Sequence, residues 1–410
     1  MQLIFGISVI TNTKNANLSA AKKTKNDEFY TQWADIEREM NAYLEYDPNV
    51  FRGKTILLPC DDPEWSNFTK FFALHFRDYG LKKLISTSYA PNSKGVQASY
   101  QPTLFEQGNP AYDKAKSMEK GRVFVLEGND INANARVDID DLQWSYLEGD
   151  GDFRSEEVMA LRDEADFVIT NPPFSLFRDF VGWLMDGTVM FSIIGSNNAP
   201  TTKDIFPLFR ENQLWKGATA NSTDMVFGVP EGVEIAPADR LKAEQLGYKG
   251  NYTRLGNSCW FTNIEHGRRH QKLELMTTAD NIKYSKHKDV RGVGYQTYDN
   301  CDAIEVPHTD SIPEDHQGVM GVPISFLDKY NPDQFEIVGI TKTWFGFASK
   351  TYTQQTQIGK DGKMSKVTKL NDGAVLAIDT PLIGKIFYEV NGQLYRQTFP
   401  RILIRQKNAS

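Results

Sequence analysis

The sequence predicts an α/β protein in which a largely parallel sheet is covered by helices on both faces, with a β-rich region after it. Short apolar runs typical of buried strands alternate with amphipathic stretches from about residue 54 to residue 264. After about residue 265 the apolar runs become shorter and are broken by Gly, Pro and Asn. Asn391-Gly392 separates two runs that contain alternating aromatic residues, which is typical of a type I′ hairpin.

Each element is expected from its own pattern of apolar residues. Apolar runs predict strands at 54–59, 82–88, 144–148, 166–170, 188–194 and 257–262. Amphipathic spacing predicts helices at 33–46, 66–79 and 174–185. Ligands of such sheets bind at the carboxyl ends of the strands, so we expect a site in the loops that follow them. We divide the chain into a flexible extension (1–21), an α/β domain (22–264) and a second domain (265–410).

The composition is that of an ordinary globular chain. With 410 residues and 40% hydrophobic content, it is long enough for two domains with their own cores. Cys60, Cys259 and Cys301 are scattered and odd in number, which indicates neither a disulfide framework nor a zinc site and favours a reducing cytoplasm. The apolar start of the chain is too short to span a bilayer, and no later segment is apolar enough, so we expect no membrane partner. A short signal peptide is the alternative interpretation of that start.

The charge is distributed unevenly along the chain. The net charge is −7, residues 104–166 are strongly acidic, and the chain after Glu336 is basic. A second basic cluster runs from Arg268 to Arg291. An acidic body with a basic C-terminal part is typical of a modular enzyme that acts on DNA, although a solvated lysine-rich surface explains the charges equally well.

Asn171-Pro172-Pro173-Phe174 directly follows the strand expected at 166–170. An amine on a nucleobase is a poor nucleophile because its lone pair is delocalised into the ring, so a site that methylates it needs acceptors that draw the amine towards tetrahedral geometry. The Asn171 amide oxygen and the Pro172 carbonyl can accept its two N–H groups, and the prolines stiffen the loop. Phe174 offers a ring face on which a base can stack. The alternative is a plain strand-to-helix turn, which the position after a buried strand disfavours.

This motif resembles the catalytic motif of amino-group DNA methyltransferases, and the text around it is similar to the EcoRI-type adenine-specific modification methylases. The similar segments occur in family order: KKTKNDEFYTQ (22–32), CDDPEWSNF (60–68), YLEGDGDFRS (146–155), VITNPPFSLFRDF (168–180), IFPLFRENQLW (205–215), WFTNIEHGRRH (260–270) and GVMGVPISFLDKYNPDQFEIVG (318–339). The resemblance implies a Rossmann-like, S-adenosylmethionine-dependent methyltransferase fold with a C-terminal target-recognition region. It also implies transfer of a methyl group to N6 of an adenine flipped out of double-stranded DNA.

The resemblance also assigns roles around the methyl donor. Phe29, Tyr30 and Thr31 match the motif that contacts the methionine carboxylate and wraps the donor. Cys60-Asp61-Asp62-Pro63 replaces the usual glycine-rich donor loop, and either Asp61 or Asp62 would bind the donor's ammonium group.

The donor's adenine would meet a second pair of residues. By the same resemblance, Asp152 accepts from the adenine's amine and Phe153 packs against its ring, with Asp150 as the alternative to Asp152. The second strand ends in Ser86-Thr87-Ser88 without the acidic residue that usually holds the ribose hydroxyls, so the ribose contact has no assigned residue.

Residues 130–141 resemble a 12-residue calcium loop. Ala135 replaces the glycine of the sharp turn, and an Asp stands where a bidentate Glu is usual, so an exposed acidic loop is the alternative interpretation. A structural Ca²⁺ would be held by the oxygen side chains at loop positions 1, 3, 5, 9 and 12, which are Asp130, Asn132, Asn134, Asp138 and Asp141.

The expected partner is double-stranded DNA, with a cognate restriction endonuclease that shares the site but forms no stable complex with the chain. Phe227 or Trp260-Phe261 would form the other wall of the base pocket, although Phe261 is more typical of a core strand residue. The same motif also serves methylation of cytosine N4, an RNA base or a glutamine side chain. A DNA-binding relative that has lost catalysis is the alternative from a different class.

Overall fold

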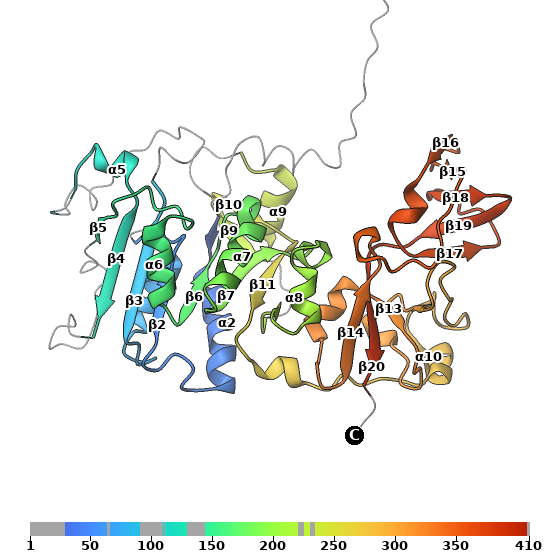
Figure 1. Ribbon diagram of the computed structural model, residues 1–410, viewed down its shortest axis with the longest axis horizontal. Coiled ribbons are helices and arrows are strands. Elements are labelled where there is room, and N and C mark those ends of the chain that lie inside the picture. Colours follow the sequence, from blue (N-terminus) through green and yellow to red (C-terminus); the bar gives the residue numbers. More distant parts are fainter. Residues whose placement is uncertain are drawn as a thin grey trace, which may run out of the picture. The chain divides into compact units, whose positions relative to one another are not determined.

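The computed structural model describes residues 29–63, 66–90, 110, 112–128, 144–219, 225–229 and 234–407 (Figure 1). The chain divides into two compact units, each assembled from segments that are distant in the sequence. The first unit comprises 1–36, 51–189 and 226–255, and the second comprises 37–50, 190–225 and 256–410.

The first unit is built on five strands in the order β5-β4-β3-β2-β6. β2 (Thr55–Leu58) is parallel to β3 (Lys83–Ser88) and to β6 (Phe167–Thr170). β4 (Arg122–Glu127) is antiparallel to β3, and β5 (Trp144–Tyr146) is antiparallel to β4. The expectation of parallel strands is therefore confirmed for the central three and wrong for β5. β4 was not predicted from the sequence, and its alternating burial is typical of a half-covered antiparallel strand.

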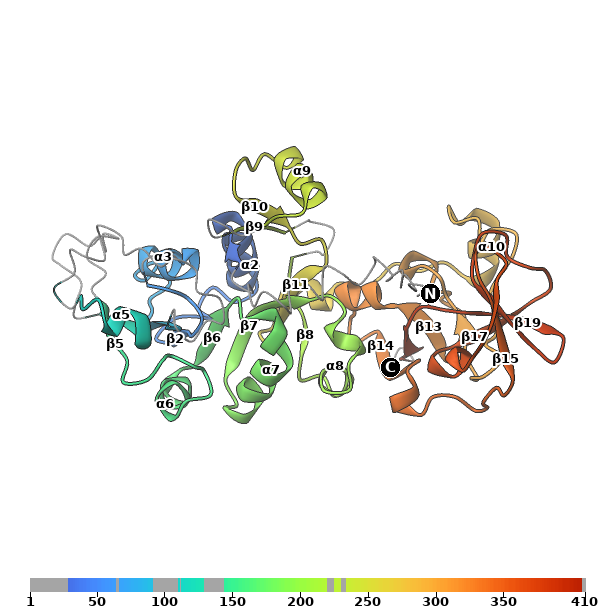
Figure 2. The same ribbon diagram turned by 90° about the horizontal axis from the view of Figure 1, so that it is seen from above.

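Helices cover both faces of these strands. Figure 2 shows α3 (Asn67–Leu74) on one face and α6 (Glu156–Glu164) with α7 (Phe177–Asp186) on the other. Ser66 and Ser155 begin α3 and α6 as N-caps, because their hydroxyls accept the backbone N–H groups of Phe68 and Val158. Among the described residues, this unit also contains α5 (Lys116–Glu119) and α9 (Pro237–Gln245).

A small antiparallel sheet joins segments of the first unit that are far apart in the sequence. β9 (Val226–Gly228) lies between β1 (Tyr30–Thr31) and β10 (Tyr252–Arg254). In this register Thr31 lies opposite Phe227. The sheet thereby fixes the backbone of the FYT segment.

The second unit contains most of α2 (Trp33–Tyr46) and three strands in the order β7-β11-β8. β11 (Ser258–Thr262) is antiparallel to both β7 (Met190–Ser196) and β8 (Trp215–Lys216). Glu39 of α2 is fully buried, and its carboxylate accepts the backbone N–H groups of Ala218 (2.7 Å) and Thr219 (2.8 Å). This buried carboxylate anchors the chain that leaves β8.

The remainder of the second unit contains two further sheets. One has the order β12 (Ile304–Glu305), β13 (Met320–Pro323), β20 (Arg401–Gln406) and β14 (Phe335–Ile340). The other has the order β16 (Met364–Val367), β15 (Gln355–Ile358), β18 (Phe387–Val390), β19 (Gln393–Gln397) and β17 (Val375–Ile378). The hairpin prediction is confirmed, since Asn391 (φ 52°) and Gly392 (φ 81°) connect β18 and β19 with the positive φ angles of a type I′ turn.

Short helices connect these strands. The α-helices are α8 (Phe206–Arg210) and α10 (Thr278–Tyr284). The 3₁₀ turns of the whole described chain are η3 (Phe174–Leu176), η4 (Ala199–Thr201), η5 (Gly267–His270), η6 (Thr309–Ser311), η7 (Ile324–Lys329), η8 (Thr343–Phe345) and η9 (Lys369–Asp372). None of the helices in the described ranges has the length and apolar character that a bilayer crossing requires.

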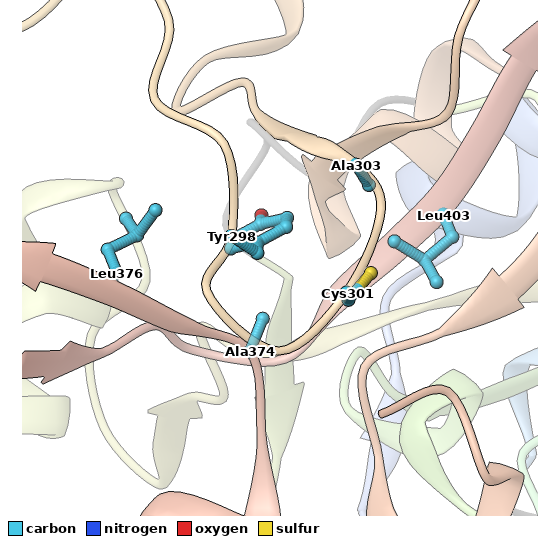
Figure 3. Close-up of a cluster of buried hydrophobic side chains, with 6 residues drawn as sticks. All are labelled: Tyr298, Cys301, Ala303, Ala374, Leu376 and Leu403. Atoms are coloured by element: carbon cyan, nitrogen blue, oxygen red, sulfur yellow. The ribbon is translucent and has the colours of Figure 1, made fainter. Parts of the chain in front are cut away.

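A cluster of buried side chains joins the loop before β12 to β17 and β20 (Figure 3). Burial raises the pKa of the Cys301 thiol to about 11, so this cysteine behaves as a small apolar side chain. All three cysteines are free, in agreement with the prediction of no disulfide framework. The cluster consists of Tyr298, Cys301, Ala303, Ala374, Leu376 and Leu403.

We predict that Gly151→Ala destabilises the chain by about 2 kcal/mol or more. Gly151 has a φ of 83°, and a Cβ added there would overlap the Ser88 carbonyl oxygen at the end of β3. The control is Gly182→Ala in α7, where a Cβ meets no atom within 4 Å. Because alanine favours helix, the control variant should be unchanged or slightly stabilised. Urea unfolding measures both, and equal free energies of unfolding for the two variants would contradict the prediction.

Candidate active site

The loops that carry the expected site meet at one edge of the sheet in the first unit. β2, β3 and β6 are parallel, so their carboxyl ends lie at the same edge. Ser88, the last residue of β3, pairs with Arg122 at the start of β4, and Arg122 pairs with Tyr146 at the end of β5. The chain after β5 therefore reaches the same edge, where the Ala90 N–H donates to the Asp150 carbonyl at 2.7 Å. The expectation of a site after the strands is consistent with this arrangement.

Asn171 is the first residue after β6 and is half-buried. Its amide nitrogen donates a hydrogen bond to the Phe29 carbonyl oxygen at 2.7 Å. That bond sets the orientation of the amide, because only the nitrogen can donate to a carbonyl. The amide oxygen Oδ1 is buried and finds no partner among the described residues. A buried acceptor without a partner is rare in native proteins, so this oxygen is poised to accept an N–H from a ligand.

Two aromatic rings lie close to Phe29, whose carbonyl binds this amide. The rings of Phe29 and Phe174 lie 6.1 Å apart, and those of Phe29 and Phe227 lie 6.0 Å apart. Phe174 and Phe29 are half-buried, whereas Phe227 is fully buried. Phe227 therefore supports Phe29 from the core side, and Phe174 is the ring with a face available to a ligand. Trp260 and Phe261 are both core residues of β11, which agrees with the core interpretation of Phe261.

Two side-chain amides attach the FYT segment to the strand ends. Asn171 binds the Phe29 carbonyl, and the amide nitrogen of Asn67 donates to the Thr31 carbonyl at 2.8 Å. Thr31 is buried, and its hydroxyl oxygen has no partner within the described part of the chain. A second unpaired polar atom thus accompanies the Asn171 oxygen. Tyr30, which lies between Phe29 and Thr31 in the sequence, is 37% exposed and faces away from the core.

Asp61 stabilises the loops of the site through two hydrogen bonds. Its carboxylate accepts hydrogen bonds from the Ser66 hydroxyl (2.6 Å) and from the Thr170 hydroxyl (2.6 Å). Thr170 is the residue before Asn171, so Asp61 joins the loop after β2 to the end of β6. Burial raises the pKa of Asp61 to about 7, although both hydroxyl donors oppose the change. Asp61 and its hydroxyl partners hold the backbone from which Asn171 projects.

Asp62 differs from its neighbour in its surroundings. Its side chain is 26% exposed, and one carboxylate oxygen lies 3.5 Å from the guanidinium of Arg122. Arg122 is buried and stacks on Trp144, with 4.6 Å between the guanidinium carbon and the ring centroid. The structure therefore distinguishes the two acids that the sequence could not, since Asp61 points into the protein and Asp62 lies nearer the solvent.

Asp152 and Phe153 lie in the loop after β5. The carboxylate of Asp152 is held by the Arg154 guanidinium through two hydrogen bonds of 2.9 and 2.6 Å, which keep the pKa of that carboxyl below its usual value. Phe153 is 5% exposed, and its ring packs edge-on against Phe180 and Trp183. Phe153 thus anchors the loop in the core and leaves a small part of its ring accessible.

Several residues of the site were missed by the analysis of the sequence. Ser66, Asn67, Arg122 and Thr170 each bond a residue that the resemblance singled out. Their polar character beside strand ends was visible, but their partners depend on the fold. The expected calcium ligands (Asp130, Asn132, Asn134, Asp138 and Asp141) lie outside the described residues, and the comparisons below give no support for calcium.

One basic residue expected on the surface is a core residue. Arg269 is buried, and its guanidinium carbon stacks 3.7 Å from the ring centroid of Trp215. It also bonds the Asn212 side chain. Arg269 therefore belongs to the packing of the second unit and leaves the set of residues that could contact phosphates. Its stacked position explains why a basic run in the sequence overstated the exposed charge.

The fold and the site define an α/β protein that presents a buried, unpaired amide oxygen at the carboxyl end of a parallel strand. The family model described as "Adenine-specific methyltransferase EcoRI" matches residues 17–407. The chain is 39% identical over 332 residues to the Type II methyltransferase M.EcoRI of Escherichia coli, covering 81% of this chain and 91% of that protein. It is 34% identical over 322 residues to the Type II methyltransferase M.MpnI of Mycoplasma pneumoniae, covering 78% and 83%.

The chain belongs to the EcoRI family of adenine-specific methyltransferases, as its sequence motifs predicted, and it is an adenine-specific DNA methyltransferase. The Type II methyltransferase M.MgeORF184P of Mycoplasma genitalium is 32% identical over 324 residues, which cover 78% of this chain and 85% of that protein. No solved structure matches the chain.

We predict that Asp61→Asn removes a pH dependence of stability between about pH 4 and pH 7. The pKa of Asp61 is raised in the folded chain to about 7, from 3.8 for the free side chain. The folded state therefore keeps a proton that the unfolded state releases, and stability falls as pH rises through this range, by an amount on the order of a few kcal/mol. Urea unfolding at pH 4.5 and pH 8 measures the change.

The matched control is Asp62→Asn, which removes the adjacent carboxylate, one that is partly exposed. It should retain the pH dependence of the wild-type chain. If the free energy of unfolding of Asp61→Asn depends on pH as that of the wild type and of Asp62→Asn does, the Asp61 carboxylate is not the source of the pH dependence and the prediction is contradicted.

Proposed function

We propose that this site transfers a methyl group from S-adenosylmethionine to N6 of an adenine that is flipped out of double-stranded DNA. The observation that carries the proposal is the buried Asn171 Oδ1, which has no partner among the described residues. The half-buried ring of Phe174 lies 6.1 Å from that of Phe29, the residue whose carbonyl binds the Asn171 amide. An N6 amine is the group that adenine offers to such an acceptor. Membership of the EcoRI family supports the choice of adenine.

Asn171 and the Pro172 carbonyl act on the amine. Each accepts one N–H of the adenine amine, which draws the nitrogen towards tetrahedral geometry and frees its lone pair for attack. Both acceptors also stabilise the positive charge that develops on the nitrogen, and the extra proton leaves to solvent afterwards. The Phe29 carbonyl holds the Asn171 amide in the required orientation through a bond of 2.7 Å. Phe174 stacks on the flipped base, and Pro173 positions that ring.

The residues at the strand ends fit S-adenosylmethionine, which supplies a methyl group on a positively charged sulfur. The unpaired Thr31 hydroxyl supports this fit, because it is a buried polar atom in the segment that would wrap the donor. Phe29, Tyr30 and Thr31 would contact the methionine part. Asp62, the more exposed acid, would bind the ammonium group, while Asp61 braces the loop. Asp152 and Phe153 would face the adenine of the donor, with Asp150 as the alternative for Asp152.

DNA recognition is proposed for the chain from residue 265 onward, and catalysis for residues 22–264, in a Rossmann-like arrangement. Exposed lysines gather around β16 and the turns beside it, and two of them, Lys350 and Lys363, pair with Asp299 and Asp361. Such lysines suit contacts with phosphates, which set affinity, while polar side chains read bases. The five basic residues of the stretch 349–369 are Lys350, Lys360, Lys363, Lys366 and Lys369. We propose restriction protection as the biological role, with an endonuclease that shares the site but does not stay bound.

The test of the proposed reaction is to incubate the chain with unmethylated DNA and tritiated donor and to identify the labelled base. We expect label on N6 of adenine in double-stranded DNA. Label on cytosine, on RNA alone or on protein would select another substrate for the same chemistry. No label on any substrate, with DNA binding retained, would indicate an inactive relative.

We predict that Asn171→Ala lowers turnover by about 10²-fold or more, because it removes an acceptor that acts on the developing charge. Affinity for S-adenosylmethionine, measured by calorimetry, should change less than threefold, which is under 1 kcal/mol. The control is Asn49→Ala, which removes an exposed amide in the turn after α2 and should leave turnover unchanged. Comparable losses of turnover and donor affinity in Asn171→Ala would show that Asn171 maintains the fold instead.

We predict that a triple variant with Lys363, Lys366 and Lys369 changed to Ala binds DNA more weakly at low salt. If all three contact phosphates, the slope of log K against log salt should fall by about 3 in magnitude. The matched control changes Lys114, Lys116 and Lys120 of the first unit to Ala. Both proteins are compared by fluorescence anisotropy on a labelled duplex over a salt series. Equal slopes for the two triple variants would exclude the β16 surface from DNA contact.

A further inference from the structure

Two His-x-Asp segments in the second unit have no role in the methyl-transfer site. His287-Lys288-Asp289 follows α10, and His308-Thr309-Asp310 begins at the residue before η6. The fold brings the two segments together. Each histidine faces the aspartate of the other segment, so that the four side chains form a reciprocal pair.

The distances between these four side chains are short. His287 Nε2 lies 2.8 Å from Asp310 Oδ1, and His308 Nε2 lies 3.1 Å from each carboxylate oxygen of Asp289. The two imidazole rings stack with centroids 3.6 Å apart and planes inclined by 7°. One ligand atom from each of His287, Asp289 and His308 lies within 4.8 Å of the other two.

The backbone that carries these side chains is tightly anchored. The His287 N–H donates to the Ser285 hydroxyl (3.2 Å), and the His287 carbonyl accepts the Arg291 N–H (2.8 Å). The His308 carbonyl accepts the N–H of Ser311 (3.0 Å). Ser285 and Ser311 are both buried. The side chains are thus held on two fixed loops, as a preorganised site requires.

We propose that His287, Asp289 and His308 bind one divalent transition-metal ion of the zinc class. Two imidazole nitrogens with a carboxylate oxygen form the donor set that Zn²⁺ accepts, whereas Ca²⁺ and Mg²⁺ prefer oxygen ligands alone. In a tetrahedral zinc site with bonds of about 2.0–2.1 Å, neighbouring ligand atoms are about 3.3 Å apart. The separations between the His308 nitrogen and both Asp289 oxygens, 3.1 Å each, are close to that value. An imidazole binds a metal in the plane of its ring, so one of the two stacked rings would have to rotate out of the stack to complete the site.

Asp310 has a supporting role in this arrangement. One of its oxygens lies against His287, and the other accepts from the Lys286 ammonium at 2.7 Å. A carboxylate that orients a ligating imidazole is a common outer partner of zinc sites. Because Asp310 lies against Nε2 of His287, His287 would bind the metal through Nδ1, and water would take the fourth position. The ion would join the chain after α10 to η6 and would stabilise the second unit without taking part in methyl transfer.

Ion pairs alone explain the cluster less well. Exposed pairs between histidine and aspartate contribute little to stability, and two protonated imidazoles stacked face to face repel each other. A metal ion binds two neutral imidazoles and therefore removes this repulsion. If the experiment detects no Zn²⁺ binding, ion pairs alone account for the cluster.

The experiment titrates the EDTA-treated full-length chain with ZnCl₂ in a calorimeter and records the visible spectrum with CoCl₂, in the absence of DNA and donor. We expect one equivalent of Zn²⁺ to bind, and we expect the melting temperature to rise with Zn²⁺ and to fall again with excess EDTA. His287→Ala and His308→Ala should each lose this equivalent. Asp289→Asn, which keeps the shape of the side chain, should weaken binding by about 10-fold or more.

The matched control is His270→Ala. His270 is an exposed histidine between two acids, with Glu265 at 3.0 Å and Asp333 at 3.4 Å, and it is not part of the stacked histidine pair. The His270→Ala variant should bind one equivalent of Zn²⁺, as the wild-type chain does. The proposal is overturned if the wild-type chain binds no Zn²⁺ at concentrations below about millimolar. It is also overturned if His287→Ala, His308→Ala and His270→Ala all still bind one equivalent of Zn²⁺. The spectrum of the wild-type chain with Co²⁺ needs no variant, and an octahedral spectrum would also contradict the proposed site.

Discussion

The hydrogen bond from the Asn171 amide nitrogen to the Phe29 carbonyl is the constraint on which the candidate active site depends. It uses the donor end of the amide and leaves the acceptor end buried without a partner. The carbonyl is itself held in place because the neighbouring strand β1 pairs with β9, and because Asn67 binds the Thr31 carbonyl. An acceptor that acts on a substrate amine is thus positioned by segments from three distant parts of the sequence. A buried, unsatisfied acceptor is costly in a protein without a ligand, which is a cost typical of functional sites.

The buried Asp61 provides a second support for the same acceptor. It receives hydroxyl hydrogen bonds from Ser66, in the loop after β2, and from Thr170, the last residue of β6. Desolvation opposes its charge more strongly than the two hydroxyls favour it, so the carboxyl has a pKa of about 7. Burial of the Asp61 carboxylate therefore costs folding stability, because the charged group would be more stable in water. In return, its two hydroxyl partners fix the position of the loop and of the end of β6. Rigid placement of a catalytic side chain commonly depends on such outer contacts.

The sequence predicted those parts of the structure that depend on local pattern. Buried apolar runs predicted β2, β3, β6 and β11 within a residue or two, and Asn391-Gly392 predicted its hairpin. The alternating pattern of β4 was missed, and the direction of β5 could not follow from apolar runs, because neighbours in a sheet are chosen by tertiary packing. The NPPF motif identified Asn171, yet its bond to Phe29 and the brace by Asp61 and Thr170 required the fold. Likewise, only burial separated Asp61 from Asp62, and only stacking on Trp215 showed that Arg269 is a core residue.

The most direct measurement of the central claim is a binding comparison on two duplexes. One carries adenine at the target position, and the other carries purine, in which hydrogen replaces the N6 amine. With a donor analogue present, the wild-type chain should bind the adenine duplex more tightly than the purine duplex after correction for the cost of opening each base pair. Asn171→Ala should lose most of that difference, because the acceptor for the amine is gone. If the variant distinguishes the two duplexes as well as the wild-type chain does, the Asn171 oxygen does not bind the amine and the account is contradicted.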